Sequence, residues 1–75
     1  MPDVTLDASG LRCPMPLLKT KLELSAMKAG QELEVIATDA GSARDIPSFL
    51  KFTSHVLVDS SESEGCYRFL IRRGQ

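Results

Sequence analysis

The chain has 75 residues, a formal net charge of -1, and the hydrophobic and charged fractions (43% and 25%) of an ordinary soluble globular protein. Its length predicts one domain, residues 1–75, with a small core. The lack of an apolar run of about 20 residues excludes a membrane-spanning helix, and the weak negative charge argues against direct binding of nucleic acid.

The cysteine and histidine content further limits the possible chemistry. The chain has two cysteines, Cys13 and Cys66, and one histidine, His55. These are too few for a disulfide framework or a four-ligand zinc site, so we expect no metal and no cofactor. The beginning of the chain lacks the basic and apolar regions of a signal peptide. We therefore expect a cytoplasmic protein that acts through thiol chemistry and contacts no membrane.

The first half of the chain predicts a strand, a helix and a second strand. Residues 4–7 alternate between apolar and polar side chains, which is typical of a half-buried strand. A helix is expected from residue 14 to about Lys28, with Gly30 as its C-terminal stop. Residues 32–38 pass from alternation into an apolar run, as in a strand at the centre of a sheet.

A second helix follows a turn at residues 39–42. Its N-cap is either Ser42 or Asp45, and the helix runs to about residue 52. If Asp45 is the cap, Pro47 falls in or near the first turn, where a proline costs least. The expected buried face consists of Ile46, Phe49, Leu50 and Phe52.

Two further strands are expected at residues 56–59 and 67–72, joined by a polar hairpin over residues 60–65. Two helices cannot cover both faces of a four-stranded sheet. The expected fold class is therefore an α/β two-layer sandwich (α+β), with a mixed sheet and both helices on one face. Three basic residues are expected on a solvated strand face, or alternatively at a docking surface for an acidic partner: Arg68, Arg72 and Arg73.

Cys13 is located where a loop becomes a helix. Pro14 and Pro16 are tolerated within one turn only at a helix start, so Cys13 is expected to be the N-cap. Its sulfur would accept a hydrogen bond from the Met15 amide and lie at the positive end of the helix dipole, beside Arg12. Both features lower the pKa of a thiol and favour a thiolate or persulfide anion. We predict that Cys13 is the reactive residue and that Arg12 stabilises its thiolate.

Two apolar stripes run along the first helix at helical spacing. The stripe expected to face the sheet consists of Leu17, Thr20, Leu24 and Met27. The second stripe begins beside Cys13 and consists of Met15, Leu18 and Leu22. This second stripe is either a further part of the core or a docking surface for partner proteins.

Together these residues resemble the TusA/SirA-like sulfur-carrier family, whose signature is a Cys-Pro-x-Pro at the start of the first helix. The resemblance covers almost the whole chain. The matching segments are Leu6-Asp7-Ala8, Gly10-Leu11-Arg12-Cys13-Pro14 with Pro16, Ala29-Gly30, Arg44-Asp45-Ile46-Pro47 with Phe49, and Tyr67-Arg68-Phe69-Leu70-Ile71-Arg72. The chain departs from the family pattern at Ser48, where glycine is common, and at Cys66.

The resemblance implies the two-layer sandwich and assigns Cys13 to carrying sulfane sulfur as a persulfide. Family members receive sulfur from a cysteine desulfurase or a rhodanese-type donor and pass it to a downstream relay protein. They serve tRNA 2-thiouridine formation, molybdenum-cofactor assembly or sulfur oxidation, and the resemblance does not distinguish these pathways. The residues that support the motif are Gly10, Pro14, Pro16 and Asp45.

Several residues have simpler interpretations. Asp45 is expected to cap its helix rather than act near Cys13, His55 to be a turn or strand residue, and Cys66 to be inert. Two other functions remain open: a thiol redox switch that joins Cys13 to Cys66, and a regulatory binding module whose cysteine is incidental. The sequence shows no obvious base beside Cys13 and no large substrate cleft, so we expect a sulfur-transfer carrier without enzymatic turnover of its own. We also expect a monomer.

Overall fold

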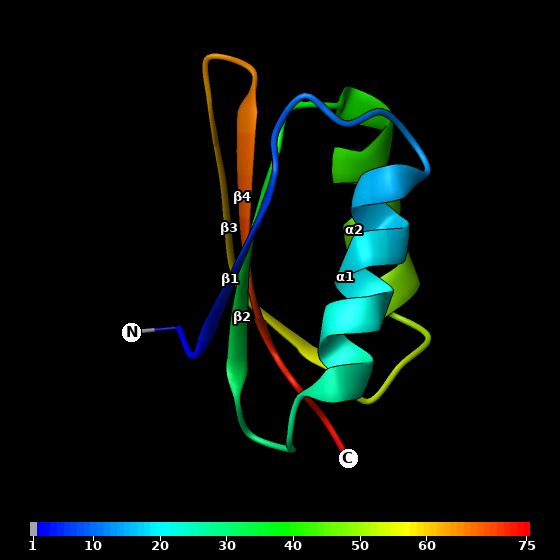
Figure 1. Cartoon of the computed structure of the whole chain (residues 1–75), viewed down its shortest axis with the longest axis vertical. Coiled ribbons are helices and arrows are strands. Elements are labelled where there is room, and N and C mark those ends of the chain that lie inside the picture. Colours follow the sequence, from blue (N-terminus) through cyan, green and yellow to red (C-terminus); the bar gives the residue numbers. More distant parts are fainter. Residues whose placement is uncertain (1) are drawn as a thin grey trace.

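The computed structural model describes residues 2–75, which form a four-stranded sheet and two helices. In chain order the elements are β1 (Val4–Ala8), α1 (Met15–Ala26), β2 (Glu32–Ala37), α2 (Ala40–Leu50), β3 (Val56–Ser63) and β4 (Cys66–Arg72). Figure 1 shows the sheet as one layer and both helices as a second layer on one of its faces. The predicted α/β two-layer sandwich is confirmed. Neither of the two helices in the described residues is long and apolar enough to cross a membrane.

The strand order across the sheet is β1-β2-β4-β3. β1 and β2 are parallel, because α1 returns the chain to the edge of the sheet at which β1 begins. The pairs β2–β4 and β3–β4 are antiparallel. The second predicted strand is therefore an interior strand, as expected. The parallel register aligns Ala8 with Ala37, so the segments that follow β1 and β2 begin at the same edge of the sheet.

The core fills the space between the sheet and the helices. It consists of Leu24, Met27, Leu33, Val35, Ile46, Leu50, Phe69 and Ile71. The α1 stripe predicted to face the sheet is confirmed, since Thr20, Leu24 and Met27 are buried and Leu17 packs against the core. The buried Thr20 hydroxyl donates to the Pro16 carbonyl oxygen at 2.8 Å, which satisfies its polar group.

The start of α1 differs from the prediction. The helix begins at Met15 with Pro14 as its N-cap, so Cys13 precedes the cap and is not the cap itself. The Met15 amide donates to the Arg12 carbonyl oxygen at 2.8 Å, and this oxygen replaces the sulfur as the acceptor. The Cys13–Pro14 peptide bond is cis. Pro16 occupies the second helical position, where a missing amide costs little.

The end of α1 also lies earlier than predicted. Met27 adopts an extended conformation and buries its side chain in the core, so the helix stops at Ala26 and Lys28 lies beyond its last turn. Gly30, with a φ of 89°, belongs to the turn into β2. Its amide donates to the Arg73 carbonyl oxygen at 2.8 Å. Gly30 therefore shapes this turn and is not the helix stop.

The second helix begins earlier than predicted. Asp39 is the N-cap of α2, because its Oδ2 atom accepts a hydrogen bond from the Ser42 amide at 2.9 Å. Neither Ser42 nor Asp45 caps the helix. With this earlier start, Pro47 lies inside α2 rather than in its first turn, which costs the helix one backbone hydrogen bond.

The buried face of α2 is largely as predicted, except at its end. Ile46 and Leu50 are buried, and Phe49 packs against the core. Phe52 lies beyond the last helical residue and is 87% exposed, so its assignment to the core is wrong. The chain has already left the helix there, in a turn in which the Phe52 amide donates to the Phe49 carbonyl oxygen at 3.1 Å.

The hairpin between β3 and β4 is tighter than predicted. The polar run expected as a loop pairs with β4 as far as Ser63 and Cys66, because strand pairing satisfies its backbone groups. Only Glu64 and Gly65 form the turn, with φ angles of 51° and 78°. Positive φ at both positions is the conformation that two-residue hairpin turns favour.

The sheet face opposite the helices carries ion pairs. Arg68 pairs with Glu34, and Arg72 Nη2 lies 3.6 Å from Glu32 Oε2. Arg73 is placed differently, since its Nε donates to a backbone carbonyl oxygen of α1 at 3.0 Å. The predicted strand face therefore holds Arg68 and Arg72 but not Arg73.

Candidate functional site

The candidate site lies where the loop after β1 meets the turn between β2 and α2. These segments leave parallel, neighbouring strands at one edge of the sheet. Gly10, with a φ of 79°, donates its amide to Thr38 Oγ1 at 2.8 Å. The Cys13 amide donates to Asp39 Oδ2 at 3.3 Å. These two bonds fix the segment that carries Cys13 against the start of α2.

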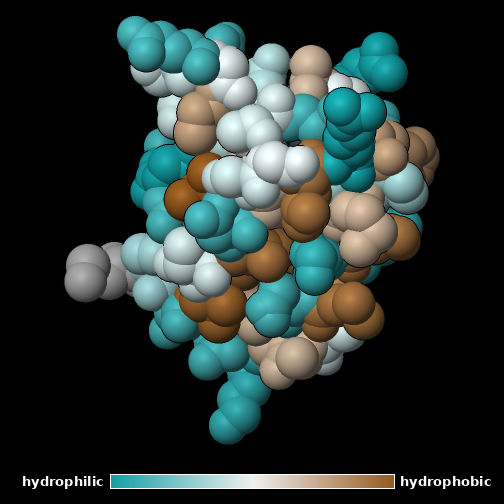
Figure 2. Space-filling model, turned by 45° about the horizontal axis from the view of Figure 1, so that its top comes forward, coloured by the Kyte–Doolittle hydropathy of each residue, from teal (hydrophilic) through white to brown (hydrophobic). Residues whose placement is uncertain are grey.

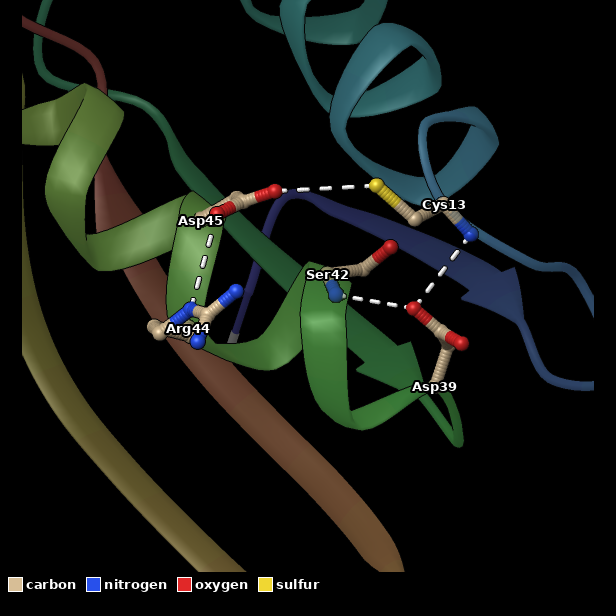
Figure 3. A network of polar contacts seen from close by, with 5 residues as sticks. All are labelled: Cys13, Asp39, Ser42, Arg44 and Asp45. Carbon is tan, nitrogen blue, oxygen red and sulfur yellow. Dashed lines mark hydrogen bonds and ion pairs between the residues drawn. The ribbon is translucent and has the colours of Figure 1, made fainter.

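Asp39 connects the two sides of the site. Its Oδ2 atom accepts hydrogen bonds from the amides of both Ser42 and Cys13 (Figure 3). The bond from the Ser42 amide is the main cause that lowers the pKa of Asp39, and the Cys13 amide and the Arg12 charge act in the same direction. The glycine at position 41 leaves room for the Asp39 carboxylate, since a Cβ atom on Gly41 would lie 3.2 Å from Asp39 Oδ2. The residue that caps α2 thus also positions the backbone of Cys13.

Asp45 is the hydrogen-bond partner of the Cys13 side chain. The thiol donates to Asp45 Oδ2 with an Sγ–O distance of 3.6 Å (Figure 3). The other carboxylate oxygen of Asp45 lies 3.9 Å from Arg44 Nε. The prediction that Asp45 caps α2 is wrong, because Asp39 already holds that position and Asp45 falls on the helical turn that faces the sulfur.

The surroundings of Cys13 raise the pKa of its thiol. Although the residue is exposed, desolvation by nearby protein atoms is the largest cause, followed by the hydrogen bond and charge of Asp45 and then the charge of Asp39. The Ser42 hydroxyl opposes this rise. The sequence predicted the opposite direction from the helix dipole and from Arg12.

The physical reason for this difference is the position of the sulfur. Cys13 lies outside the helix cap, its thiol is directed to the Asp45 carboxylate, and Asp39 adds a second negative charge nearby. The charge of Arg12 acts on Asp39. A role of Arg12 in stabilising the Cys13 thiolate stays a prediction.

Ser42 is a residue of the site that the sequence indicated only as a possible cap. It is 0% exposed, and its Oγ is the one buried side-chain nitrogen or oxygen within residues 2–75 that lacks a hydrogen-bond partner. Figure 3 shows this hydroxyl in the space bounded by Cys13, Asp39 and Asp45. The nearby Ser42 hydroxyl lowers the pKa of both Cys13 and Asp39. Its Oγ nevertheless forms no hydrogen bond with either residue.

The second apolar stripe of α1 is exposed. The exposed fractions of Met15, Leu18 and Leu22 are 42%, 43% and 70%. Figure 2 shows hydrophobic side chains that reach the surface among hydrophilic ones. The alternative in which these three residues belong to the core is wrong, and their use in docking stays a prediction.

Two other residues considered from the sequence lie outside the site. Cys66 pairs with Ser63 beside the hairpin turn, and the alternation along β4 directs it to the face away from the helices. This hairpin and the start of α1 lie apart in Figure 1. His55 Nδ1 accepts a hydrogen bond from the Gly74 amide at 2.9 Å, and burial and the charge of Arg73 lower its pKa. His55 thus holds the end of the chain, in keeping with its structural interpretation.

Fold and site together define a small α/β protein that presents an exposed thiol just before a helix, beside two carboxylates. A family model described as "Sulfurtransferase TusA" matches residues 4–73. The sulfur carrier protein TusA of Allochromatium vinosum is 51% identical over 71 residues, which cover 95% of this chain and 93% of that protein. The chain belongs to the TusA family, as the resemblance in its sequence predicted.

A second relative and one solved structure are also similar to this chain. A putative sulfur carrier protein of Neisseria meningitidis serogroup A is 43% identical over 68 residues, which cover 91% of this chain and 92% of that protein. The crystal structure of a SirA-like protein from Desulfitobacterium hafniense has the same fold, with a TM-score of 0.82. It is 23% identical, and the match covers 96% of this chain and 99% of that one.

Proposed function

We propose that the chain is a cytoplasmic sulfur carrier that holds sulfane sulfur as a persulfide on Cys13. The observation that supports this most is the exposed Cys13 thiol, fixed through its amide to Asp39 and through its sulfur to Asp45. Relatives of this chain are named as sulfur carriers. A thiol that is exposed and held in place can meet the persulfide of another protein.

Loading transfers one sulfur atom without net oxidation. The Cys13 sulfur bonds to the terminal sulfur of the donor persulfide, the S–S bond of the donor breaks, and the donor cysteine leaves as a thiol. The donor is a cysteine desulfurase or a rhodanese-type protein. Unloading repeats the exchange with a downstream relay protein, in tRNA 2-thiouridine formation, molybdenum-cofactor assembly or sulfur oxidation. The exchange itself uses no metal or cofactor.

Partner proteins dock on the exposed stripe of Met15, Leu18 and Leu22. The stripe begins two residues after Cys13, so a partner that covers it brings its own cysteine close to the transferred sulfur. Such a transient interface needs less than about 1,200 Å² of total buried area, and a few apolar anchors can dominate its affinity. The exposed fractions of these side chains, 42% to 70%, leave them accessible to a partner.

The geometry favours the carrier over an intramolecular redox switch. The Cα atoms of a disulfide lie about 4.4–6.8 Å apart. Cys66 instead faces away from the helices, beside a hairpin that is separate from the start of α1 (Figure 1). A carrier needs only Cys13.

Mass spectrometry of the intact protein tests this function. After incubation with a cysteine desulfurase and L-cysteine, the chain should gain one sulfur atom, and dithiothreitol should remove it. Cys66→Ser should load like the unaltered chain, whereas Cys13→Ser should not load. Loading that persists in Cys13→Ser would refute the proposed function.

A further inference from the structure

The Cys13 sulfur has a hydrogen-bond acceptor and an unused hydrogen-bond donor next to it, both on α2. The acceptor is Asp45 Oδ2, 3.6 Å from Sγ. The donor is the Ser42 hydroxyl, which is 0% exposed and unpaired within residues 2–75. Figure 3 shows it in the space bounded by Cys13, Asp39 and Asp45. Folded proteins rarely leave a buried hydroxyl unpaired, so its position calls for an explanation.

The protonation state of the sulfur explains why this donor is unused. A thiol has one proton, and Cys13 directs it to Asp45. A thiolate has only lone pairs and accepts hydrogen bonds, so the Ser42 hydroxyl can donate to it after rotation about its C–O bond. The Asp39 oxygen that faces Cys13 already accepts two amides. The Ser42 hydroxyl is therefore available to a charged sulfur, although Asp39 and Asp45 disfavour that charge in the resting site.

We propose that Asp45 and Ser42 assist sulfur uptake by Cys13: Asp45 receives the thiol proton, and the Ser42 hydroxyl donates a hydrogen bond to the sulfur as negative charge develops on it. This inference rests on the proposed carrier function for the nature of the sulfur donor. It assigns to each of the two residues a role in the transfer step.

The step balances without a further reactant. The Sγ–H bond of Cys13 breaks, and the proton passes to Asp45 Oδ2. The electron pair left on Sγ bonds to the terminal sulfur of the donor persulfide, and the S–S bond of the donor breaks. The leaving thiolate then takes the proton from Asp45. Cys13–SH and R–S–SH thus become Cys13–S–SH and R–SH, with no oxidant or reductant consumed.

The bond from Ser42 acts mainly in the transition state. It forms only while the sulfur is charged, so it stabilises the reacting state more than the resting thiol. Removal of this hydroxyl should leave the fold intact, because a buried group without a partner contributes no hydrogen bond to the folded state.

The charges around the sulfur allow the role of Asp45 to be separated from a simple charge effect. Asp45 and Asp39 disfavour the thiolate, and the Ser42 hydroxyl favours it. Arg12 acts on Asp39, and Arg44 lies 3.9 Å from the second oxygen of Asp45. Replacing Asp45 by asparagine should therefore increase the amount of thiolate. If Asp45 were only a repelling charge, sulfur uptake would become faster; if it receives the proton, uptake becomes slower.

The test compares Asp45→Asn and Ser42→Ala, both in a Cys66→Ser background that leaves Cys13 as the single thiol. The pH dependence of alkylation by iodoacetamide gives the pKa of this thiol. The rate of loading from glutathione persulfide at pH 7, followed by mass spectrometry, gives the transfer step. Thermal melting reports on the fold of each variant.

Matched controls use residues of the same types away from the sulfur. Ser48→Ala changes an exposed serine of α2, and Asp59→Asn changes an exposed aspartate of β3. Neither residue contacts Cys13 in the hydrogen-bond network of the site. Both controls should keep the thiol pKa and the loading rate of the background protein.

We expect Asp45→Asn to lower the thiol pKa and yet to slow loading at least about tenfold. We expect Ser42→Ala to raise the thiol pKa and to slow loading about tenfold, with no loss of melting temperature. Equal or faster loading in Asp45→Asn overturns the role of Asp45, and an unchanged thiol pKa or loading rate in Ser42→Ala overturns that of Ser42.

The two readouts also separate this inference from the proposed function. Alkylation needs no sulfur donor, so the pKa changes test the two residues even if the unaltered chain does not load. A failure of the unaltered chain to load contradicts the carrier function. Normal loading of the unaltered chain and of both variants contradicts only the roles of Asp45 and Ser42.

Discussion

Replacing Leu18 by aspartate should weaken partner binding while leaving the fold intact. Leu18 is 43% exposed, whereas Leu24 on the same helix is 1% exposed and belongs to the core. Exposed substitutions usually change the free energy of unfolding by less than about 0.5 kcal/mol, whereas Leu24→Ala should cost about 2–5 kcal/mol. In a domain of this size 1 kcal/mol shifts the melting temperature by about 4–8 °C. Leu18→Asp should therefore shift it by less than about 4 °C, and Leu24→Ala should lower it by at least about 8 °C.

The effect on binding should be much larger than the effect on stability. An apolar anchor in a small interface contributes about 2 kcal/mol, which is about a 30-fold change in Kd. Isothermal titration calorimetry with a cysteine desulfurase would measure it, with Ser48→Asp on the exposed side of α2 as a control for the added charge. If Leu18→Asp destabilises the fold as Leu24→Ala does, the stripe is part of the core. If its Kd is unchanged, the stripe does not dock this partner.

Three other measurements test the contacts around Cys13. In a Cys66→Ser background at pH 8, iodoacetamide should alkylate Cys13 more slowly in the folded chain than in urea, because the fold raises the thiol pKa. This difference in rate should vanish at high pH, and equal rates at pH 8 would contradict the raised pKa. The free energy of unfolding should fall as the pH drops below about 4, because folding lowers the pKa of Asp39. The stabilisation from Asp39 is present above the pKa of the unfolded state, and it is lost as the pH falls through the pKa of the folded state. Asp39→Asn should flatten this part of the urea-unfolding curve measured against pH, and an unchanged slope would count against Asp39. Pro16→Ala should lower the melting temperature by about 5–10 °C in calorimetry, because Pro16 is fully buried and its truncation leaves a cavity. An equal or higher melting temperature would show that the neighbouring side chains fill this cavity without loss of stability.

The sequence was sufficient to predict the order of the elements and their layers. Hydrophobic periodicity is a local property, and it correctly indicated the strands, both helices and the α1 stripe of Thr20, Leu24 and Met27. Helix ends were less predictable because contacts distant in sequence decide them. The Gly30 amide, for example, bonds to the carbonyl oxygen of Arg73, and the buried position of Met27 ends α1.

The candidate site was predictable only in part, for the same reason. Pro14 and Pro16 were a local signal for a helix start, and they correctly placed Cys13 beside one. The partner of its sulfur, Asp45, is 32 positions away, and no local pattern joins the two. The expected direction of the thiol pKa followed from the assumed cap and was therefore wrong.

The cap of α2 was missed although a local signal existed. Asp39 follows a strand and precedes Ser42 by three positions, which is a spacing suited to an N-cap. Ser42 and Asp45 competed for this assignment, and a cap at Asp45 would place Pro47 in the first turn of a shorter helix. Packing of the longer helix against the core outweighs the cost of that proline.

The chemical state of Cys13 in the cell is the most direct test of the carrier function. Growing cells would be treated with iodoacetamide before lysis, and the Cys13 and Cys66 peptides of the purified chain would be analysed by mass spectrometry. We predict that part of the Cys13 peptide carries one additional sulfur between Sγ and the alkyl group, that reduction before alkylation removes it, and that the Cys66 peptide carries none. A Cys13–Cys66 disulfide, or direct alkylation of Cys13 in every molecule, would contradict the account.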